Sequence, residues 1–479
     1  MSTRSVSLAL LVLLLSFACA DDSDYPEDLI QDKTKTVQEI PSNPQDLSQL
    51  RYADLKSLSG EFTGYPLWVS NNPEDVTGYG VLSSTRPQEA KGSRSQERGA
   101  PLPDLIWGDA GVSASEAQGC SVGTFRGLNL YLAHILSSRH LSGSRRLSIV
   151  VEATEALTLR YGGLLGTTSW SDPSGMKTVR PDWLGAKVAH DALMRAMTLS
   201  LEAGRAQGQV SLTNGERFAI DTLSVDSLVE GSFTLESAGC FAVHVIAHDQ
   251  AYDPSLPLPS YASGDVKWPG WYNGVGFGRA SGLYEGSLWE GRGDIEITQE
   301  KQAFGWKMFD ADGSPAALGR HGDSAELLFG GYGVVYSSEI NLTNSTQSCV
   351  SAHVGFTSYV NLKMKEGVDK LGDARTPSVR DLNLSDPSAR PSMLWNGPLL
   401  LSQQLGDGSM VDQLHEVIMT PTIARDEWGS PNNIPRGLHK KLFRWDLKPG
   451  ENRLARLHIP VPGYIVAPAA ITVETSPCP

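Results

Sequence analysis

The chain has 479 residues, of which 40% are hydrophobic and 20% charged, and its formal net charge is -14 at pH 7. This length suffices for about two to four domains with a sizeable core, and 48 Gly and 28 Pro break the chain often without a low-complexity composition. Because each contact to a phosphate needs a Lys or Arg, the acidic balance disfavours nucleic acids and anionic membranes as partners.

Residues 1–20 have the pattern of a secretory signal peptide. Arg4 supplies a positive charge, residues 8–18 form an apolar run, and Ala18-Cys19-Ala20 is a small-residue cleavage site. The run is shorter than the ~20 residues that span a bilayer, so no transmembrane segment is predicted. Two interpretations stay open: simple secretion, or cleavage before Cys19 with lipidation of that residue, as in bacterial lipoproteins. Either one predicts an exported protein in the periplasm, at the outer membrane, on the cell surface or outside the cell.

An acidic segment follows the signal. Residues 21–50 carry eight acidic residues against two lysines, a net charge of -6, and few large apolar side chains. Such a segment buries too little surface to offset chain entropy, which predicts a disordered stalk over 21–55. A second polar stretch, 86–103, is predicted to be a loop.

Most of the remaining chain has the pattern of short β-strands separated by turns. Apolar and β-branched residues form pairs of short runs, as in a hairpin, over 147–163 and 232–249. The same format recurs over 333–358, 440–462 and 464–475. Short strands at intervals of about ten residues are typical of sandwiches and barrels.

One segment has helical spacing instead. Leu184, Val188, Ala192 and Arg195 recur at about 3.6 residues, which predicts a short helix near 184–197. A single helix does not change the class. We therefore predict a mainly β protein with two or more β-sandwich-like domains, and divide the chain into an N-terminal one over 56–265 and a C-terminal one over 266–479.

The segment 267–294 is rich in aromatic residues and contains eight glycines. Flat aromatic faces stack on sugar rings and nearby carboxylates accept hydrogen bonds from hydroxyls, so one interpretation is a glycan-binding face. The other is a hairpin or linker whose aromatics pack onto the two cores. The candidate ligand-binding residues are Trp268, Trp271, Tyr272, Tyr284 and Trp289 with Glu285 and Glu290.

Cysteine usage agrees with export. Four cysteines besides Cys19 are an even number, and their spacings of 120, 109 and 129 residues fit no metal-binding knuckle. Structural disulfides and buried free thiols are both open, and the sequence does not choose among the three connectivities. These residues are Cys120, Cys240, Cys349 and Cys478.

Several of these segments resemble a mainly cyanobacterial family of secreted all-β proteins without an assigned activity. The resemblance covers about residues 60–479, and it implies a fold but no catalytic residues. Added cysteines and the polar loop at 86–103 depart from the family pattern. The matching segments are FTGYPLWVSNNPEDVTGYGVLSSTRP (62–87), LNLYLAHIL (128–136), AKVAHDALMR (186–195), GRAQGQVSL (204–212), GCFAVHVIAH (239–248), FGRASGLYEGSLWEG (277–291), GGYGVVYSSEINLTN (330–344) and LKPGENRLARLHIPVP (447–462).

Three motifs are similar to metal-binding or catalytic motifs, but each lacks a feature that such a site requires. His244 and His248 lie four apart on a predicted strand, about 13 Å from each other, which is too far for one metal ion. The run Asp310–Gly313 lacks the Gly and Glu positions of a calcium loop and is better explained as a turn. Ser174–Lys177 matches S-x-x-K, but the companion motifs of penicillin-binding enzymes are missing. No metal and no cofactor are therefore predicted.

Two short motifs carry little information. Arg292-Gly293-Asp294 spells an integrin tripeptide, which arises by chance in a chain of this length. The glycosylation sequons at Asn341, Asn344 and Asn383 matter only in a eukaryotic secretory route.

These features predict an exported, non-enzymatic β-sandwich protein of the cell envelope or exterior, with a structural or adhesion-like role. The expected partners are a polysaccharide or another envelope protein. The alternatives are a carbohydrate-binding protein that uses the 267–294 aromatics, and a glycan-cleaving enzyme with Glu285 or Glu290 as its acid.

Overall fold

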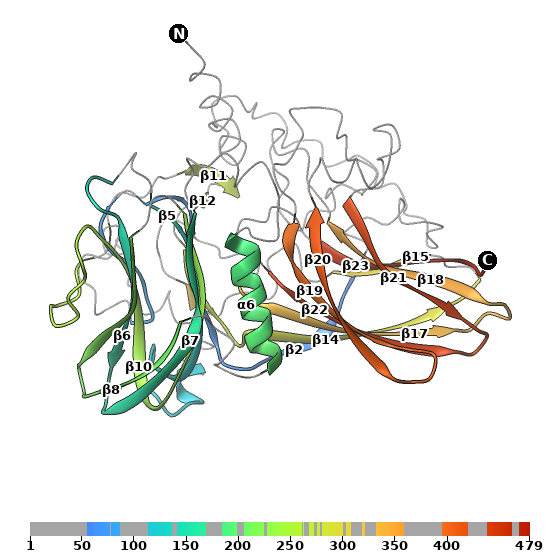
Figure 1. Cartoon of the computed structure of the whole chain (residues 1–479), viewed down its shortest axis with the longest axis horizontal. Helices are drawn as coiled ribbons and strands as arrows, with labels where there is room; N and C mark the ends of the chain where they lie inside the picture. The colour runs from blue at the N-terminus through green and yellow to red at the C-terminus, as the bar shows by residue number, and fades with distance from the viewer. Residues whose placement is uncertain are drawn as a thin grey trace, which may run out of the picture.

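A computed structural model of the chain describes residues 55–76, 78–86, 114–136, 141–168, 184–198, 206–224, 228–260, 262, 268–272, 275–277, 280–299, 303–307, 319–320, 332–358, 395–419, 438–461 and 469–479. The predicted signal peptide with Cys19, the stalk up to residue 54 and the polar loop from residue 87 lie outside this range, as do Asp310–Gly313, Ser174–Lys177 and Asn383. Over the described residues the protein is mainly β, as predicted, with two β-sandwich-like bodies and one helix of more than a single turn (Figure 1).

The first body is built around one long strand, β10 (Leu228–His248). The first half of β10 pairs with β5 (Phe125–Ile135) and β7 (Leu157–Thr168), and its second half pairs with β4 (Gly80–Ser84) and β6 (Arg146–Ala153). Both halves send alternate apolar side chains into the same core. The other strands of this ten-stranded sheet are β3 (Leu67–Asp75), β8 (Ala206–Leu212), β9 (Arg217–Ser224), β13 (Ala280–Tyr284) and β16 (Gly319–Arg320).

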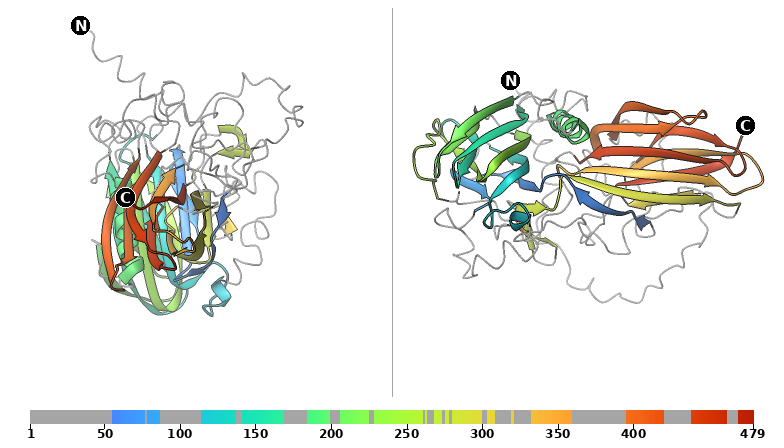
Figure 2. Two further views of the ribbon diagram at one scale, coloured as in Figure 1. Left: turned by 90° about the vertical axis from the view of Figure 1, so that its right-hand side faces the viewer. Right: turned by 90° about the horizontal axis from the view of Figure 1, so that it is seen from below.

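The second body consists of two sheets that share one apolar core. Figure 2 shows it end to end with the first body. The six-stranded sheet has the order β2 (Ser59–Thr63), β14 (Leu288–Ile297), β17 (Val335–Asn344), β22 (Asn452–Pro460), β19 (Trp395–Gln404) and β20 (Met410–Met419). The five-stranded sheet has the order β1 (Lys56–Ser57), β15 (Ala303–Lys307), β23 (Ala469–Pro477), β18 (Val350–Ser358) and β21 (Leu438–Leu447).

The chain crosses between the two bodies at two neighbouring places. The first crossing, 64–66, joins β2 of the second body to β3 of the first. The second crossing, 285–287, joins β13 of the first body to β14 of the second. Because β3 pairs with β13 and β2 with β14, both antiparallel, the crossings run side by side. The two sheet systems therefore exchange strands across the predicted boundary at 265/266.

Helix α6 (Leu184–Thr198) confirms the predicted helix and lies between the bodies (Figures 1 and 2). It contacts β7 and β10 of the first body and β19 and β22 of the second. Its Val188 is buried in the core of the second body.

The junction between the bodies is apolar. Leu67, Tyr131 and Tyr284 of the first body belong to the same buried cluster as Tyr336 and Ile340 of the second. A large hydrophobic junction fixes the relative position of two bodies, whereas a small polar one lets them move. The two bodies therefore form one stiff unit.

The strands that the sequence predicts as hairpin pairs have other partners in the structure. The runs within 147–163 form β6 and β7, but these strands pair with β10, β8 and β9 and not with each other. The runs within 232–249 form the single strand β10, which changes register between Glu236 and Phe241. The runs within 333–358 form β17 and β18, which lie in different sheets. Alternation located the strands over 147–163 and 333–358, but the predicted division of 232–249 into two strands is wrong. The partners of all these strands depend on distant segments.

Both pairs of cysteines form disulfides. Cys120–Cys240 ties the segment before β5 to the point where β10 changes register. Cys349–Cys478 ties the start of β18 to the end of β23. The disulfide interpretation is thus confirmed for all four residues. None of the helices among the described residues has the length and apolarity needed to span a membrane.

Candidate functional site

The structure separates the predicted aromatic residues. Tyr284 is fully buried at the junction, so it is not available to stack on a sugar. Trp289 is half-buried and meets the ring of Phe62 edge-on, with the ring centroids 5.1 Å apart. Trp268, Trp271 and Tyr272 lie on β11 (Trp268–Tyr272), which pairs with β12 (Val275–Phe277), and their side chains are outside the described part of the protein.

The two predicted carboxylates do not converge. Glu285 is exposed at the second crossing. Glu290 is exposed on β14 and accepts a hydrogen bond of 2.9 Å from the hydroxyl of Thr63. The two lie five positions apart along the chain, and neither lines the cleft beside α6 that is described below.

The weaker motifs have structural roles. Arg292 and Asp294 lie within β14 and form an ion pair of 3.2 Å, so the tripeptide is not displayed on a loop. Asn344 is fully buried and its side-chain amide donates to two backbone carbonyls, so it is not accessible to glycosylation in the folded protein. Among the described residues no group of histidines, cysteines and carboxylates could hold a metal ion.

A cleft opens beside α6 at the junction of the two bodies. Its volume is about 380 Å³, within the ~300–1,000 Å³ typical of small-molecule sites. Both crossings, helix α6, strands β3, β5 and β10 of the first body and strand β17 of the second contribute to it. Its lining residues are Gly64, Tyr65, Leu67, Asn129, Ala192, Arg195, Ala196, Ser232, Thr234, Glu236, Ser287, Gly333 and Val335.

One wall of the cleft is a polar stripe on β10. Strand side chains alternate between the two faces of a sheet, and the apolar Phe233 and Leu235 point into the core of the first body. Ser232, Thr234 and Glu236 occupy the alternate positions, on the face toward α6. Regular alternation therefore brings three polar side chains together on the cleft side.

Helix α6 covers this stripe with a buried ion pair. Asp191 and Arg195 are four residues apart and therefore share one face of the helix; the Arg195 Nε lies 2.9 Å from Asp191 Oδ2. The guanidinium also donates to the hydroxyls of Thr234 and Ser232, each at 2.6 Å. Burial lowers the pKa of Arg195, and the carboxylate of Asp191 opposes that shift. The arginine is thus held charged and fully oriented.

The hydrogen bonds continue from the helix to both crossings. Thr234 donates to Asn129 Oδ1 at 2.6 Å. The Asn129 amide in turn donates to Ser287 Oγ at 2.8 Å and to the Tyr65 carbonyl at 3.3 Å. One asparagine on β5 therefore fixes the two crossings relative to the first body, and the wall of the cleft is ordered before any ligand arrives.

Tyr65 stands at the mouth of the cleft with 39% of its surface exposed. A Cβ on Gly127 would lie 2.2 Å from the ring, so the ring rests directly on that glycine. Burial and the neighbouring carboxylate of Glu236 raise the pKa of Tyr65. Glu236 also forms an ion pair of 3.7 Å with Arg160. The ring of Tyr65 is thus fixed along one side by the backbone of β5.

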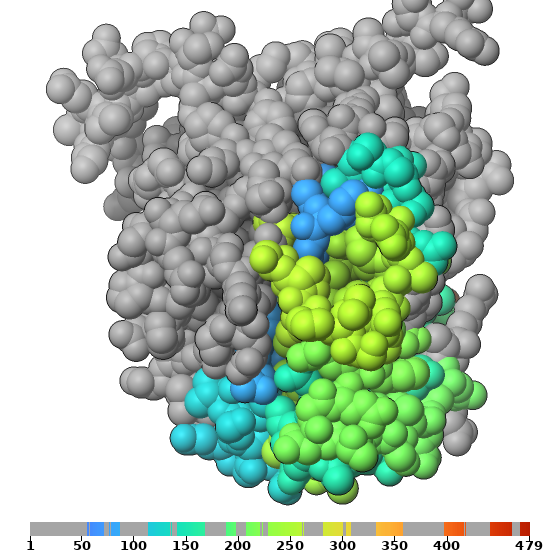
Figure 3. Space-filling view, turned by 90° about the vertical axis from the view of Figure 1, so that its left-hand side faces the viewer, coloured from blue at the N-terminus to red at the C-terminus, as the bar shows by residue number. Residues whose placement is uncertain are grey.

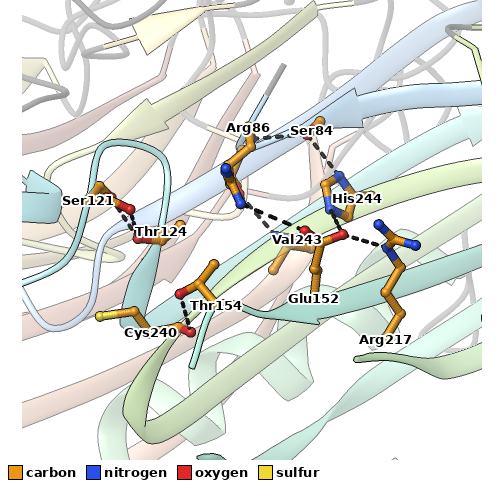
Figure 4. Close-up of polar contacts among 11 residues, drawn as sticks. Ser84, Arg86, Ser121, Thr124, Glu152, Thr154, Arg217, Cys240, Val243 and His244 are labelled. Atoms are coloured by element: carbon orange, nitrogen blue, oxygen red, sulfur yellow. Dashed lines mark hydrogen bonds and ion pairs between the residues drawn. The ribbon is translucent and has the colours of Figure 1, made fainter. Parts of the chain in front are cut away.

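A second polar cluster lies in the first body, away from the cleft (Figure 4). Ser84 Oγ is 2.8 Å from His244 Nδ1, and His244 Nε2 is 3.9 Å from Glu152 Oε2. The order serine, histidine, carboxylate matches that of a hydrolytic triad. Arg217 and Arg86 form ion pairs with the same carboxylate.

Burial rules out a catalytic role for this cluster in the observed conformation. Ser84 and His244 are completely buried, and burial, with Arg217 and Arg86, lowers the pKa of His244 to about 3. The segment after β10, yellow-green in Figure 3, lies over this part of the first body. Tyr252 and Leu258 of that segment pack on the sheet, and Arg217 donates to the Leu256 carbonyl at 3.2 Å. A general base should have a pKa near the working pH and reach a substrate, and His244 satisfies neither condition.

Sequence reasoning missed most of the cleft. Arg195 was placed on the helix, but as one position of its apolar face. A signal was nevertheless present, because Asp191 and Arg195 are spaced for one face, and a polar residue follows each apolar one over Ser232–Glu236. Nothing in the sequence joins Tyr65, Asn129 and Ser287, which only the crossings bring together.

The comparisons with known proteins do not assign the chain to a family. Neither a protein family nor a curated protein matches it, so the resemblance to the cyanobacterial family stays a prediction. Among solved structures, the chain is similar to a Penaeus vannamei nodavirus particle at 6% identity and a TM-score of 0.14, over 70% of this chain and 80% of the other. It is also similar to the CUB1-EGF-CUB2 domain of human MASP-1/3 at 8% identity and a TM-score of 0.15, over 73% and 93%.

Proposed function

We propose that this chain is an exported, non-enzymatic protein of the cell envelope or exterior that acts by binding, in an adhesion-like role, with the cleft beside α6 as its ligand site. The observation that carries the proposal is the preformed polar wall of the cleft, in which Arg195, Thr234 and Asn129 are already oriented by each other. A site whose groups are fixed in advance binds without an ordering cost. The apolar junction and the two disulfides supply the stiffness that such a site needs.

Catalysis is the less favoured proposal for this site. Glycoside hydrolysis needs two carboxyl groups on either side of the scissile bond, and Glu236 is the only carboxylate that lines the cleft among the described residues. An enzyme that uses Glu285 or Glu290 stays the alternative. It predicts product release from a polysaccharide that Glu285→Gln and Glu290→Gln both abolish.

Thermal-shift measurements with a panel of neutral saccharides, sugar acids, amines and apolar compounds test the binding function. We expect at least one class to raise the melting temperature of the wild-type protein. Ala192→Trp, which places a large ring in the cleft, should remove that shift, while Gln209→Trp on the exposed side of β8 should keep it. No shift with any class, or a shift that survives Ala192→Trp, would reject the cleft as the ligand site.

Mass spectrometry of the N-terminus of the protein isolated from its host tests the export proposal. A chain that begins at Asp21 indicates secretion, and an acylated Cys19 indicates a lipid anchor. An intact Met1 would contradict both.

A further inference from the structure

We infer that the cleft beside α6 takes a neutral, hydroxyl-rich ring compound, a sugar unit of a glycan, and discriminates against charged ligands. This inference rests on the proposed binding function and adds to it the chemical class of the ligand. The cleft contains none of the candidate residues that the sequence offers in 267–294, although Ser287 of that stretch lines it.

The first argument is the charge balance of the cleft. The positive charge of Arg195 is matched by Asp191 at 2.9 Å, and the negative charge of Glu236 by Arg160 at 3.7 Å. An anion in the cleft would be repelled by Glu236, and the positive charge of Arg195 is already matched by Asp191. A cation in the cleft would be repelled by the guanidinium of Arg195. A charged ligand loses hydration free energy when it enters a site, and an unmatched opposite charge in the site is needed to offset that loss.

The second argument is the kind of groups that line the cleft. Apolar surface from Leu67, Ala192 and Val335 alternates with the hydroxyls of Ser232 and Ser287. Ser287 Oγ accepts from Asn129, which leaves its own proton to donate. A sugar ring carries the same mixture, apolar C–H faces with hydroxyl groups between them, so each part of it would meet a matching surface.

The third argument is Tyr65. A tyrosine ring offers a large apolar face at low entropic cost, and here one side rests on Gly127, while Glu236 lines the same cleft. With 39% of the residue exposed at the mouth of the cleft, the ring is placed to stack on a sugar. The volume of about 380 Å³ suits a small ring system and excludes a folded protein as the occupant.

Isothermal titration with four trisaccharides tests the inference: cellotriose and chitotriose as neutral probes, galacturonic acid trimer as the anion and glucosamine trimer as the cation. We expect a neutral probe to bind the wild-type protein and the two charged probes to bind at least tenfold more weakly. Tyr65→Ala should weaken the neutral probe about tenfold, and Tyr65→Phe, which keeps the ring, should stay within about threefold of wild type.

Glu236→Gln is the variant that separates charge from packing. It keeps the shape of the side chain but leaves Arg160 without its partner. Binding of the galacturonic acid trimer should then rise at least fivefold, because a cation has been freed.

The experiments distinguish an incorrect ligand class from an incorrect binding function. If a charged trimer binds the wild-type protein as tightly as a neutral one, or if Tyr65→Ala binds like wild type, the ligand class is wrong while the cleft stays a binding site. If no probe binds and the thermal-shift panel also finds no ligand removed by Ala192→Trp, the binding function is rejected together with the inference.

Discussion

At the scale of single residues, two buried charged groups of the described part, Arg195 and Glu152, each have oppositely charged partners fixed beside them. Arg195 has its carboxylate partner one helical turn away and two hydroxyl acceptors on β10. Glu152 is nearly buried and is held by Arg86 and Arg217. A buried charge without a partner costs several kcal/mol, which explains why both groups sit in closed networks.

Removing one member of the Asp191–Arg195 pair should lower the free energy of unfolding more than removing both members. Arg195→Met leaves the Asp191 carboxylate buried without its cation, and we expect the free energy of unfolding to fall by about 3–5 kcal/mol. Asp191→Leu combined with Arg195→Met should recover most of that loss. Urea unfolding of the three proteins provides the comparison, and a single variant that loses less than about 1 kcal/mol would argue against a structural role for the pair.

His244 should make the protein sensitive to mild acid. Its pKa is about 3 in the folded protein, and the ordinary value is 6.5, so the unfolded chain binds more protons between these two pH values. Stability is therefore complete above about pH 6.5 and falls as the pH decreases toward 3; this histidine alone should remove about 2 kcal/mol between pH 7 and pH 5.

The variant His244→Asn keeps an acceptor for Ser84 and should flatten that part of the pH profile of unfolding free energy. His190→Asn, at an exposed position on α6, is the matched control and should leave the profile nearly unchanged. Equal profiles for wild type and His244→Asn would show that His244 is not the group responsible.

At the scale of elements, alternation and helical spacing were reliable and pairing was not. The helix over Leu184–Thr198 and the two strands on either side of the break after Asn344 follow from local periodicity, whereas the predicted break at Ser237 lies inside the single strand β10. Local patterns do not encode which strand lies beside which, because pairing depends on contacts between residues more than a hundred positions apart. For the same reason the candidate site could be predicted only in part: helical spacing places Arg195 on its helix, whereas it gives neither the partners of Arg195 on β10 nor Asn129 on β5, which bonds to Thr234.

The two disulfides act on different elements, and we expect both to stabilise the fold. Their sequence separations of 120 and 129 residues are similar, so the entropy that each removes from the unfolded chain is also similar. Replacing either pair by alanines should lower the free energy of unfolding by about 2–5 kcal/mol. Thermal melts of the Cys120/Cys240 and Cys349/Cys478 double variants would measure this, and an unchanged melting temperature would contradict it.

At the scale of the whole molecule, the two bodies depend on each other. The second body takes its first two strands, Lys56–Ser57 and Ser59–Thr63, from the start of the described chain and the rest from beyond residue 287. The first body therefore occupies a single excursion of the chain between β2 and β14, with the short strand β16 added later. Division of the protein at 265/266 would remove β1 and β2 from their sheets.

A shortened protein tests this dependence. Thr63 pairs with Leu288, so residues 55–63 joined by a short glycine linker to 286–479 should restore the edges of both sheets. We expect a cooperative thermal transition for this protein and none for residues 286–479 alone. A cooperative transition of 286–479 without the added segment would show that β1 and β2 are dispensable.

From the register of the paired crossings we infer an order of assembly. Strand β2 is synthesised long before its neighbour β14, and by itself it has no partner to pair with. Pairing of β13 with β3 within the first body brings Tyr284 opposite Leu67, which in the same register places Leu288 opposite Thr63. The first body, once folded, thus aligns two strands that are far apart along the chain and lowers the entropic cost of their meeting. In this way it serves as a template on which the second body nucleates.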